Sequence, residues 1–256
     1  DFWAGLCIRE DLGLHHLHVL GKKPLFRGIQ GWFLRKLGGI PVDPHAAGGI
    51  VGQVVEHFRS DPDFCLALAP EGTRAKVDGL RSGYYEIAKA AGVGQVVLLS
   101  AICVQRPLLA FQKAKLAFES ELAASGVTYS IVRPTAFFKS LSGQVARVQA
   151  GRPFLVFGDG GLTACKPISD ADLGRYLTAC LTDPALENRI LPIGGPGPAI
   201  TPLDQAQMLE RLTGQPVRLK RVPVALMDGI IAVLSALGRL SPKLAEKANL
   251  ARIGRY

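Results

Sequence analysis

The sequence predicts an α/β fold in which helices alternate with buried parallel strands. Short apolar runs at 64–69, 96–99 and 129–132 have the length and composition of buried strands. Segments with helical spacing of apolar residues separate these runs, and polar residues stand directly after each run. A strand, a helix and a second strand with a short return favour a right-handed parallel crossover.

The first half of the chain contains helices and short strands in alternation. Apolar residues at i, i+3 and i+4 predict the helix at 50–58, and Gly38-Gly39 ends the helix before it. Three histidines, His15, His16 and His18, stand near the end of the first helix. The expected elements are a helix at 2–20, a helix at 29–37, an edge strand at 40–42, a helix at 50–58, a strand at 64–69 and a helix at 84–91.

The second half carries clearer local signals. Ser169 and Thr201 are hydroxyl residues placed to cap two helices, and the glycine-rich turn 158–161 after 154–157 predicts a hairpin. The expected elements are a strand at 96–99, a helix at 108–124, a strand at 129–132, a hairpin at 154–161, a helix ending at Leu181, a strand at 190–193, a helix at 201–213 and an apolar helix within 222–240.

Charge and cysteine content narrow the function classes. The net charge is +9, and residues 93–256 carry the excess, with 19 Lys+Arg against 11 Asp+Glu. The basic residues are dispersed and not interleaved with aromatic residues, which argues against nucleic-acid binding. Five cysteines without paired spacing indicate core thiols in a reducing compartment and no metal site. Asp228 and Arg239 interrupt the stretch 222–240, which favours a buried or surface-lying helix over a membrane span.

Two motifs in residues 1–91 carry a first resemblance. The run Gly21-Lys22-Lys23-Pro24-Leu25-Phe26-Arg27 is followed about 45 residues later by Pro70-Glu71-Gly72-Thr73-Arg74. This pairing resembles the glycerol-3-phosphate and 1-acylglycerol-3-phosphate acyltransferase family. The resemblance implies an acceptor such as lysophosphatidate, an acyl-CoA or acyl carrier protein donor, and contact with a membrane surface.

The acyltransferase resemblance assigns roles to six residues. Arg27 and Arg74 would bind the phosphate of the acceptor, because a guanidinium makes bidentate contacts. Glu71, Gly72 and Thr73 would shape the acceptor site, and Asp1 aligns with the aspartate of the catalytic His-x4-Asp motif. The histidine of that motif would lie five positions before Asp1, so the catalytic pair is incomplete here. The alternative to a binding role for Glu71 and Arg74 is that the two side chains form an ion pair on the protein surface.

Longer motifs from about residue 88 onward carry a second resemblance. They are 97–105 (VLLSAICVQ), 111–116 (FQKAKL), 130–140 (SIVRPTAFFKS), 165–169 (CKPIS) and 191–197 (LPIGGPG). These runs resemble the divinyl chlorophyllide a 8-vinyl reductases, atypical members of the short-chain dehydrogenase superfamily. The resemblance implies an NADPH-dependent reduction of the 8-vinyl group of divinyl chlorophyllide in chlorophyll or bacteriochlorophyll synthesis.

The reductase resemblance places a cofactor site at strand ends. The superfamily carries a tyrosine and a lysine four residues apart on one helix face, and here the pair is Phe111 and Lys115. Phenylalanine cannot donate a proton, so Lys115 keeps at most the cofactor-binding role. Ser100 and Pro134-Thr135 would flank the nicotinamide, although ordinary strand-end capping is the alternative.

The same resemblance leaves the substrate pocket and part of the cofactor site open. Phe137, Phe138, Leu141 and the helix within 222–240 would either wall a pocket for the macrocycle or form core. A glycine-rich turn for the pyrophosphate is missing, because the acyltransferase-like segment stands in its place. We therefore expect weak or absent NADPH binding.

The two resemblances define the expected organisation. Residues 1–91 form a partial acyltransferase-like segment, and residues 92–256 form a partial Rossmann-like, NAD(P)-binding segment. The strand at 96–99 could add to the sheet that contains 64–69 and give one hybrid sheet. The expected location is cytoplasmic, with peripheral contact at the inner face of a bacterial membrane. The alternatives to a reductase are an acyltransferase and a non-catalytic product of gene rearrangement.

Overall fold

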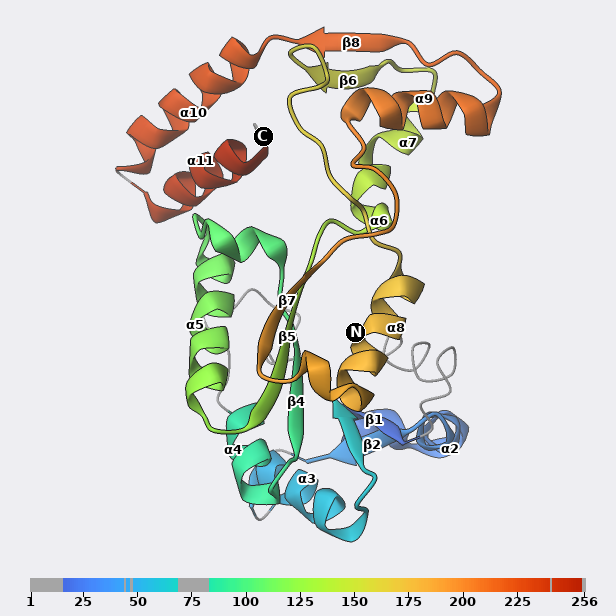
Figure 1. The fold of residues 1–256 in the computed structure, drawn as a ribbon, viewed down its shortest axis with the longest axis vertical. Coiled ribbons are helices and arrows are strands. Elements are labelled where there is room, and N and C mark those ends of the chain that lie inside the picture. The colour runs from blue at the N-terminus through green and yellow to red at the C-terminus, as the bar shows by residue number, and fades with distance from the viewer. Residues whose placement is uncertain (1–15, 44, 47, 69–82, 240, 255–256) are drawn as a thin grey trace. The chain divides into compact units, whose positions relative to one another are not determined.

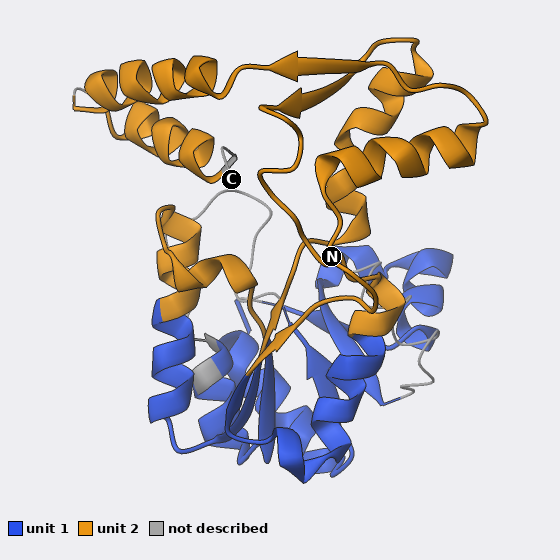
Figure 2. Cartoon of the chain, turned by 45° about the horizontal axis from the view of Figure 1, so that its top comes forward, with its two compact units in different colours: residues 1–98, 117–131, 174–190 blue, residues 99–116, 132–173, 191–256 orange. Residues whose placement is uncertain are grey.

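The computed structural model describes residues 16–43, 45–46, 48–68, 83–239 and 241–254. Two compact units make up the chain, and Figure 2 shows them in different colours. Unit 1 comprises residues 1–98, 117–131 and 174–190, and unit 2 comprises 99–116, 132–173 and 191–256. The units are therefore interleaved in the sequence, and three of the strands cross from one to the other along the chain. The division by resemblance at residue 91 stays a prediction.

A three-stranded parallel sheet lies in unit 1, with β1 (Leu17–Lys22) between β2 (Gly39–Val42) and β3 (Cys65–Ala67). Helices α2 (Gly28–Lys36) and α3 (Gly49–Ser60) make the connections. Apolar side chains from the strands and helices form two clusters, and these fix the register. The buried members are Val19, Phe26 and Leu34 in one cluster and Ile40, Val42 and Phe64 in the other.

The described residues of the predicted helix at 2–20 are not helical, while its residues 2–15, including His15, lie outside the described part of the chain. Residues 17–22 form β1, so His18 lies in the central strand, where its Nδ1 is 3.2 Å from the carbonyl oxygen of Gly38. Its ring stacks on Phe64 with centroids 4.8 Å apart. Buried Leu17 and Val19 lie on one face of β1, and half-buried His18 and Leu20 lie on the other. This alternation is that of a strand and not of a helix.

A second sheet has the strand order β4-β5-β7, formed by β4 (Gln95–Leu99), β5 (Thr128–Pro134) and β7 (Arg189–Ile193). Helices α4 (Gly83–Ala91), α5 (Ala110–Ala124) and α8 (Asp170–Thr182) alternate with these strands in the chain (Figure 1). Within unit 1, Phe118 and Leu122 of α5 pack against Ile131 of β5. The prediction of a single hybrid sheet is wrong, because among the described strands β3 and β4 belong to different hydrogen-bonded sheets.

Unit 2 contains a two-stranded parallel ladder of β6 (Phe154–Phe157) and β8 (Leu219–Val222). The predicted hairpin at 154–161 is therefore wrong. The turn itself is present, since Gly160 has φ +85° and donates its N–H to the carbonyl of Phe157 at 3.0 Å. The strand partner comes from much later in the chain. Phe154 and Val156 instead pack on Ala206 of α9 (Pro202–Thr213).

The remaining helices of unit 2 are short or paired. Helices α6 (Phe138–Leu141) and α7 (Val145–Gln149) lead into β6. Helices α10 (Val224–Gly238) and α11 (Pro242–Gly254) form a helical hairpin (Figure 1). Within the described residues, no helix is long and apolar enough to cross a membrane.

Local capping signals explain why several helices start where they do. The backbone N–H of Asp172 donates to Ser169 Oγ at 3.0 Å, which confirms the predicted cap of α8. Thr201 and Asp204 form a capping box at α9, where each side chain accepts from the backbone N–H of the other residue. The predicted starts of both helices are confirmed.

The described part of the chain contains four cysteines with free thiols, namely Cys65, Cys103, Cys165 and Cys180. Only Cys180 is buried, so the prediction of core thiols holds fully for that residue alone. The described residues contain no group of three or more side chains able to hold a metal ion.

Candidate functional site

Three chain segments of unit 2 meet where the strands of the second sheet end. The backbone N–H of Ser100 donates to the carbonyl of Val132 at 2.8 Å, and the N–H of Thr135 donates to the carbonyl of Ile193 at 2.9 Å. These two bonds tie the end of β4 to β5 and the end of β5 to β7. Ser100, Pro134 and Thr135 therefore lie at one edge of the sheet, as the sequence predicts, and this edge is where α/β proteins bind ligands.

Lys115 reaches the same edge from helix α5. Its Nζ donates to the carbonyl oxygen of Leu99 at 3.3 Å, which places the ammonium beside the backbone of Ser100. Phe111 stands one turn earlier on the same helix face and is 49% exposed. The structure thus places Lys115 beside Ser100 at the end of β4, with Phe111 one turn earlier on the same helix.

A buried glutamine sets the start of the helix that carries Lys115. Gln112 is only 1% exposed, and its Oε1 accepts from the backbone N–H groups of Leu108 at 2.8 Å and Leu109 at 2.9 Å. A residue at the third helical position that bonds back to the residue before the helix closes its first turn. The position of Lys115 depends on this contact, and Gln112 was missed as a positioning residue.

A second loop, unassigned from the sequence, supports Thr135. Thr135 Oγ1 donates to the carbonyl oxygen of Lys166, and the N–H of Gly195 donates to the same oxygen at 3.3 Å. A Cβ at Gly195 would overlap the carbonyl oxygen of Pro167, so only glycine allows this approach. The signal available was Gly194-Gly195 directly after a strand.

The hydrogen bond to Lys166 limits what Thr135 can offer a ligand. A hydroxyl has one donor proton and two acceptor lone pairs, and the proton of Thr135 is used within the protein. Its oxygen can still accept from an N–H or O–H group. Next to this loop, burial raises the pKa of the Cys165 thiol, which therefore stays protonated near neutral pH.

Phe137 and Phe138 lie just beyond the strand end. Phe137 forms a parallel bridge with Ile168, and the N–H of Phe138 donates to the carbonyl of Ile168 at 3.4 Å. The backbone here is fixed, while the Phe138 ring is half-exposed. Phe138 is therefore surface rather than core, and Phe137 is partly buried.

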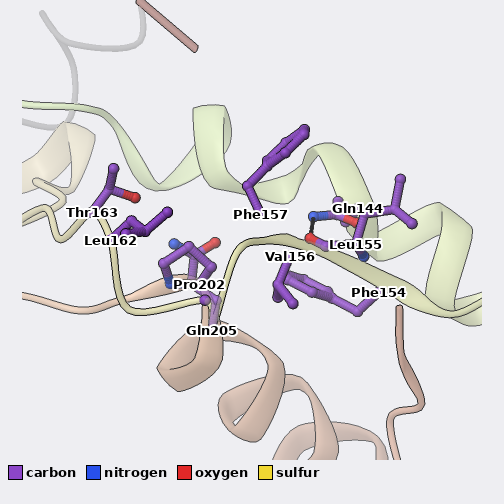
Figure 3. A pocket seen from close by; sticks show the side chains of 10 residues that line it. Gln144, Phe154, Leu155, Val156, Phe157, Leu162, Thr163, Pro202 and Gln205 are labelled. Carbon is purple, nitrogen blue, oxygen red and sulfur yellow. Dashed lines mark hydrogen bonds between the residues drawn. The ribbon is translucent and has the colours of Figure 1, made fainter. Parts of the chain in front are cut away.

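A small pocket in unit 2 does not coincide with these residues. Strand β6 and helix α9 line it, with Gln144 bridging the backbone of Leu155 (Figure 3). Its volume of about 180 Å³ is below the roughly 300–1,000 Å³ of typical ligand pockets. None of the predicted site residues lines this pocket.

Most of the acyltransferase-like residues fall outside the described part of the chain. These are Asp1, Glu71, Gly72, Thr73 and Arg74. Arg27 is described, and it is an exposed residue that directly precedes α2. Whether Arg27 and Arg74 converge stays a prediction.

Comparison with known proteins confirms the second resemblance. Residues 64–184 match a family model described as NAD(P)H-binding. The chloroplastic divinyl chlorophyllide a 8-vinyl-reductase of Oryza sativa subsp. indica is 50% identical over 203 residues, covering 75% of this chain and 49% of that protein. The Zea mays protein of the same name is 53% identical over 176 residues, with 67% and 44% covered. The chain spans about half the length of these relatives.

Solved structures of low sequence identity share the fold. Crystal structures of pinoresinol-lariciresinol and phenylcoumaran benzylic ether reductases include one with a TM-score of 0.69 at 18% identity, covering 97% of this chain and 82% of that chain. A Staphylococcus aureus nucleoside-diphosphate-sugar epimerase has a TM-score of 0.67 at 14% identity, with 99% and 86% covered. The chain therefore has an α/β, Rossmann-like fold with parallel sheets.

The comparisons also bear on the first 91 residues. The family-model match begins at residue 64, and the alignment with the Cucumis sativus reductase, at 44% identity, covers 79% of the chain. Both therefore extend into the segment that the sequence assigns to an acyltransferase-like region. The comparisons give that assignment, and the idea of a chimeric chain, no support.

Proposed function

We propose that this chain, a relative of the divinyl chlorophyllide a 8-vinyl-reductases, forms the nicotinamide side of an NADPH-dependent reductase acting on the 8-vinyl group of divinyl chlorophyllide. The observation that carries the proposal is the Lys115 ammonium, held at the end of β4 beside Ser100. Identities of 44–53% with four chloroplastic reductases support the same activity.

The residues at the strand ends fit the ribose and nicotinamide of the cofactor. Lys115 keeps protons free to donate to ribose hydroxyls after its bond to Leu99, because an ammonium has three donors. Thr135 offers an acceptor lone pair, and the backbone of Ser100 is fixed by its bond to Val132. When bound, NADPH would supply the hydride. The vinyl group would gain this hydride and one proton to become ethyl.

Phe111 cannot be the donor of the proton that the vinyl group gains. Its ring has no ionisable group, although it occupies the place of the superfamily's tyrosine. The proton must then come from water or from another group at the site. The half-exposed Phe138 ring gives a flat apolar surface on which a macrocycle can stack.

None of the residues assigned to the cofactor is part of a pyrophosphate-binding loop. The short-chain dehydrogenase pattern holds the pyrophosphate at a helix start after a glycine-rich turn. The glycine-rich stretch 48–52 does start α3, but Gln53 there bonds the backbone of Asp43 and Gly49 with Nε2 at 2.8 and 2.7 Å. We therefore expect NADPH to bind weakly, through its nicotinamide half.

Titration of the purified chain with NADPH tests the proposal. Nucleotide fluorescence would report binding, with and without divinyl chlorophyllide, and chromatography would detect the 8-ethyl product. Saturable binding with product formation is the expected result. A folded chain that neither binds NADPH nor reduces the vinyl group would refute it. The contact with a bacterial membrane that the acyltransferase resemblance implies has no support from the matched relatives, which are chloroplastic proteins.

A further inference from the structure

Helix α10 exposes apolar residues, and its two polar residues, Asp228 and Ser235, are half-buried. Leu226, Ile230, Val233 and Leu237 are 43–59% exposed, and their spacing of four, three and four residues places them in one stripe. The structure describes every residue of α10, and each exposed one is apolar or glycine. A helix on the surface of a water-soluble domain normally has the opposite arrangement.

Ser235 of α10 contacts the partner helix. Arg252 of α11 donates from Nη2 to Ser235 Oγ at 2.9 Å, which ties the two helices together. At the turn between them, a Cβ on Gly238 would lie 2.8 Å from the Cα of Ala245, so the helices approach closely. The hairpin is therefore a packed unit, and the apolar stripe of α10 is exposed to solvent.

Basic residues surround this stripe. Residues 218–256 contain eight Lys+Arg and two Asp+Glu, which is most of the excess positive charge of the chain. Lys220 and Arg221 precede α10 and Arg239 follows it, and all three are exposed. On α11, Lys243 and Lys247 are also exposed. An apolar helix face bordered by cations is complementary to a surface with acyl chains beneath anionic headgroups.

The length of α10 decides how it would meet such a surface. Fifteen residues give a helix of about 22 Å, shorter than the roughly 30 Å hydrocarbon core of a bilayer. A helix lying flat in the interface can bury one face, with flanking lysine and arginine side chains at headgroup level. The exposed stripe and the basic flanks both fit this orientation.

We propose that the α10–α11 hairpin docks on an anionic lipid bilayer, with α10 in the plane of the interface. Leu226, Ile230, Val233 and Leu237 enter the acyl boundary, and Lys220, Arg221 and Arg239 bind lipid phosphates. A second copy of the chain would cover the apolar stripe equally well. It would, however, bring the basic flanks of two hairpins together, which favours the bilayer as the occupant.

Vesicle flotation with the full chain tests the docking. Vesicles of phosphatidylcholine with phosphatidylglycerol should bind the protein, whereas pure phosphatidylcholine vesicles should bind it much less. Ile230→Ser combined with Val233→Ser should lower vesicle affinity about 100-fold, roughly tenfold for each apolar side chain removed from the interface. Lys220→Glu combined with Arg221→Glu should remove the preference for the anionic vesicles and its dependence on salt.

A matched substitution on another helix controls for general loss of apolar surface. Leu212 of α9 is 81% exposed, and Leu212→Ser should leave vesicle binding unchanged. Circular dichroism would show that each variant folds. The proposal fails if the wild-type chain ignores anionic vesicles, if Leu212→Ser weakens binding as much as the α10 variant, or if the α10 variant binds normally. It also fails if the chain is a dimer in solution that the α10 substitutions split, since a second copy then covers the stripe.

Discussion

Replacing Lys115 by methionine isolates the ammonium at the strand end. Methionine keeps an unbranched stem of similar length, so packing along α5 is retained while the donor is lost. The bond from Nζ to Leu99 is 3.3 Å long and solvent-exposed, so folding stability should change by no more than about 0.5 kcal/mol. A hydrogen bond between an ammonium and a ligand contributes about 1.5–3 kcal/mol, which corresponds to a roughly 10- to 150-fold weaker NADPH affinity.

Fluorescence titration with NADPH measures this loss, and thermal unfolding checks the fold. Lys113→Met is the control, because Lys113 lies on the same helix and is exposed on another face. An unchanged dissociation constant in Lys115→Met, or an equal loss in both variants, would show that the ammonium at Leu99 does not bind the cofactor.

Three further substitutions test the supports of the fold and site. Gly195→Ala should destabilise the chain by about 2 kcal/mol or more in urea unfolding, because its Cβ meets backbone and not a movable side chain, whereas Gly94→Ala meets nothing within 4 Å and should be neutral. Gln112→Met should cost about 2–3 kcal/mol by the same measurement, since two N–H groups at the start of α5 lose their acceptor. The N–H and then the hydroxyl of Thr201 hold the pKa of Asp204 below its usual value. Because the folded pKa is the lower one, this stabilisation is present above about pH 4 and is lost as the pH falls through the folded value, so Asp204→Asn should flatten the acid side of a stability curve.

Local signals explain what the sequence predicted well. Ser169 and Thr201 cap their helices through contacts spanning three residues, and such contacts are readable from spacing alone. The positions of Ser100 and Thr135 were predictable for another reason. Each follows an apolar run that reads as a strand, and a parallel sheet places the carboxyl ends of its strands at one edge.

Contacts between distant parts of the chain explain the errors. Strand β6 pairs with residues 219–222 and not with its own neighbour, so the glycine turn after it predicted a hairpin that is absent. The loop under Thr135 joins Lys166 to Gly195 across 28 residues, and nothing in either motif alone indicates the contact. The outward stripe of α10 was read as either core or a surface helix, because its apolar composition does not say which face is covered.

A hydrogen bond within unit 2 joins the α10–α11 hairpin to the residues that precede α5, the helix that carries Lys115. Asn249 of α11 donates from Nδ2 to the carbonyl oxygen of Leu108 at 3.1 Å, and Leu108 lies two residues before α5 begins. Through this bond, docking of the hairpin changes NADPH affinity by as much as the free energy of the bond differs between the free and docked states. A neutral hydrogen bond contributes about 1 kcal/mol, so anionic vesicles should change NADPH affinity by no more than about fivefold. In Asn249→Ala, vesicle flotation should persist while the change in affinity disappears. If the change in affinity survives in that variant, the coupling runs through other contacts and the Asn249 bond is only structural.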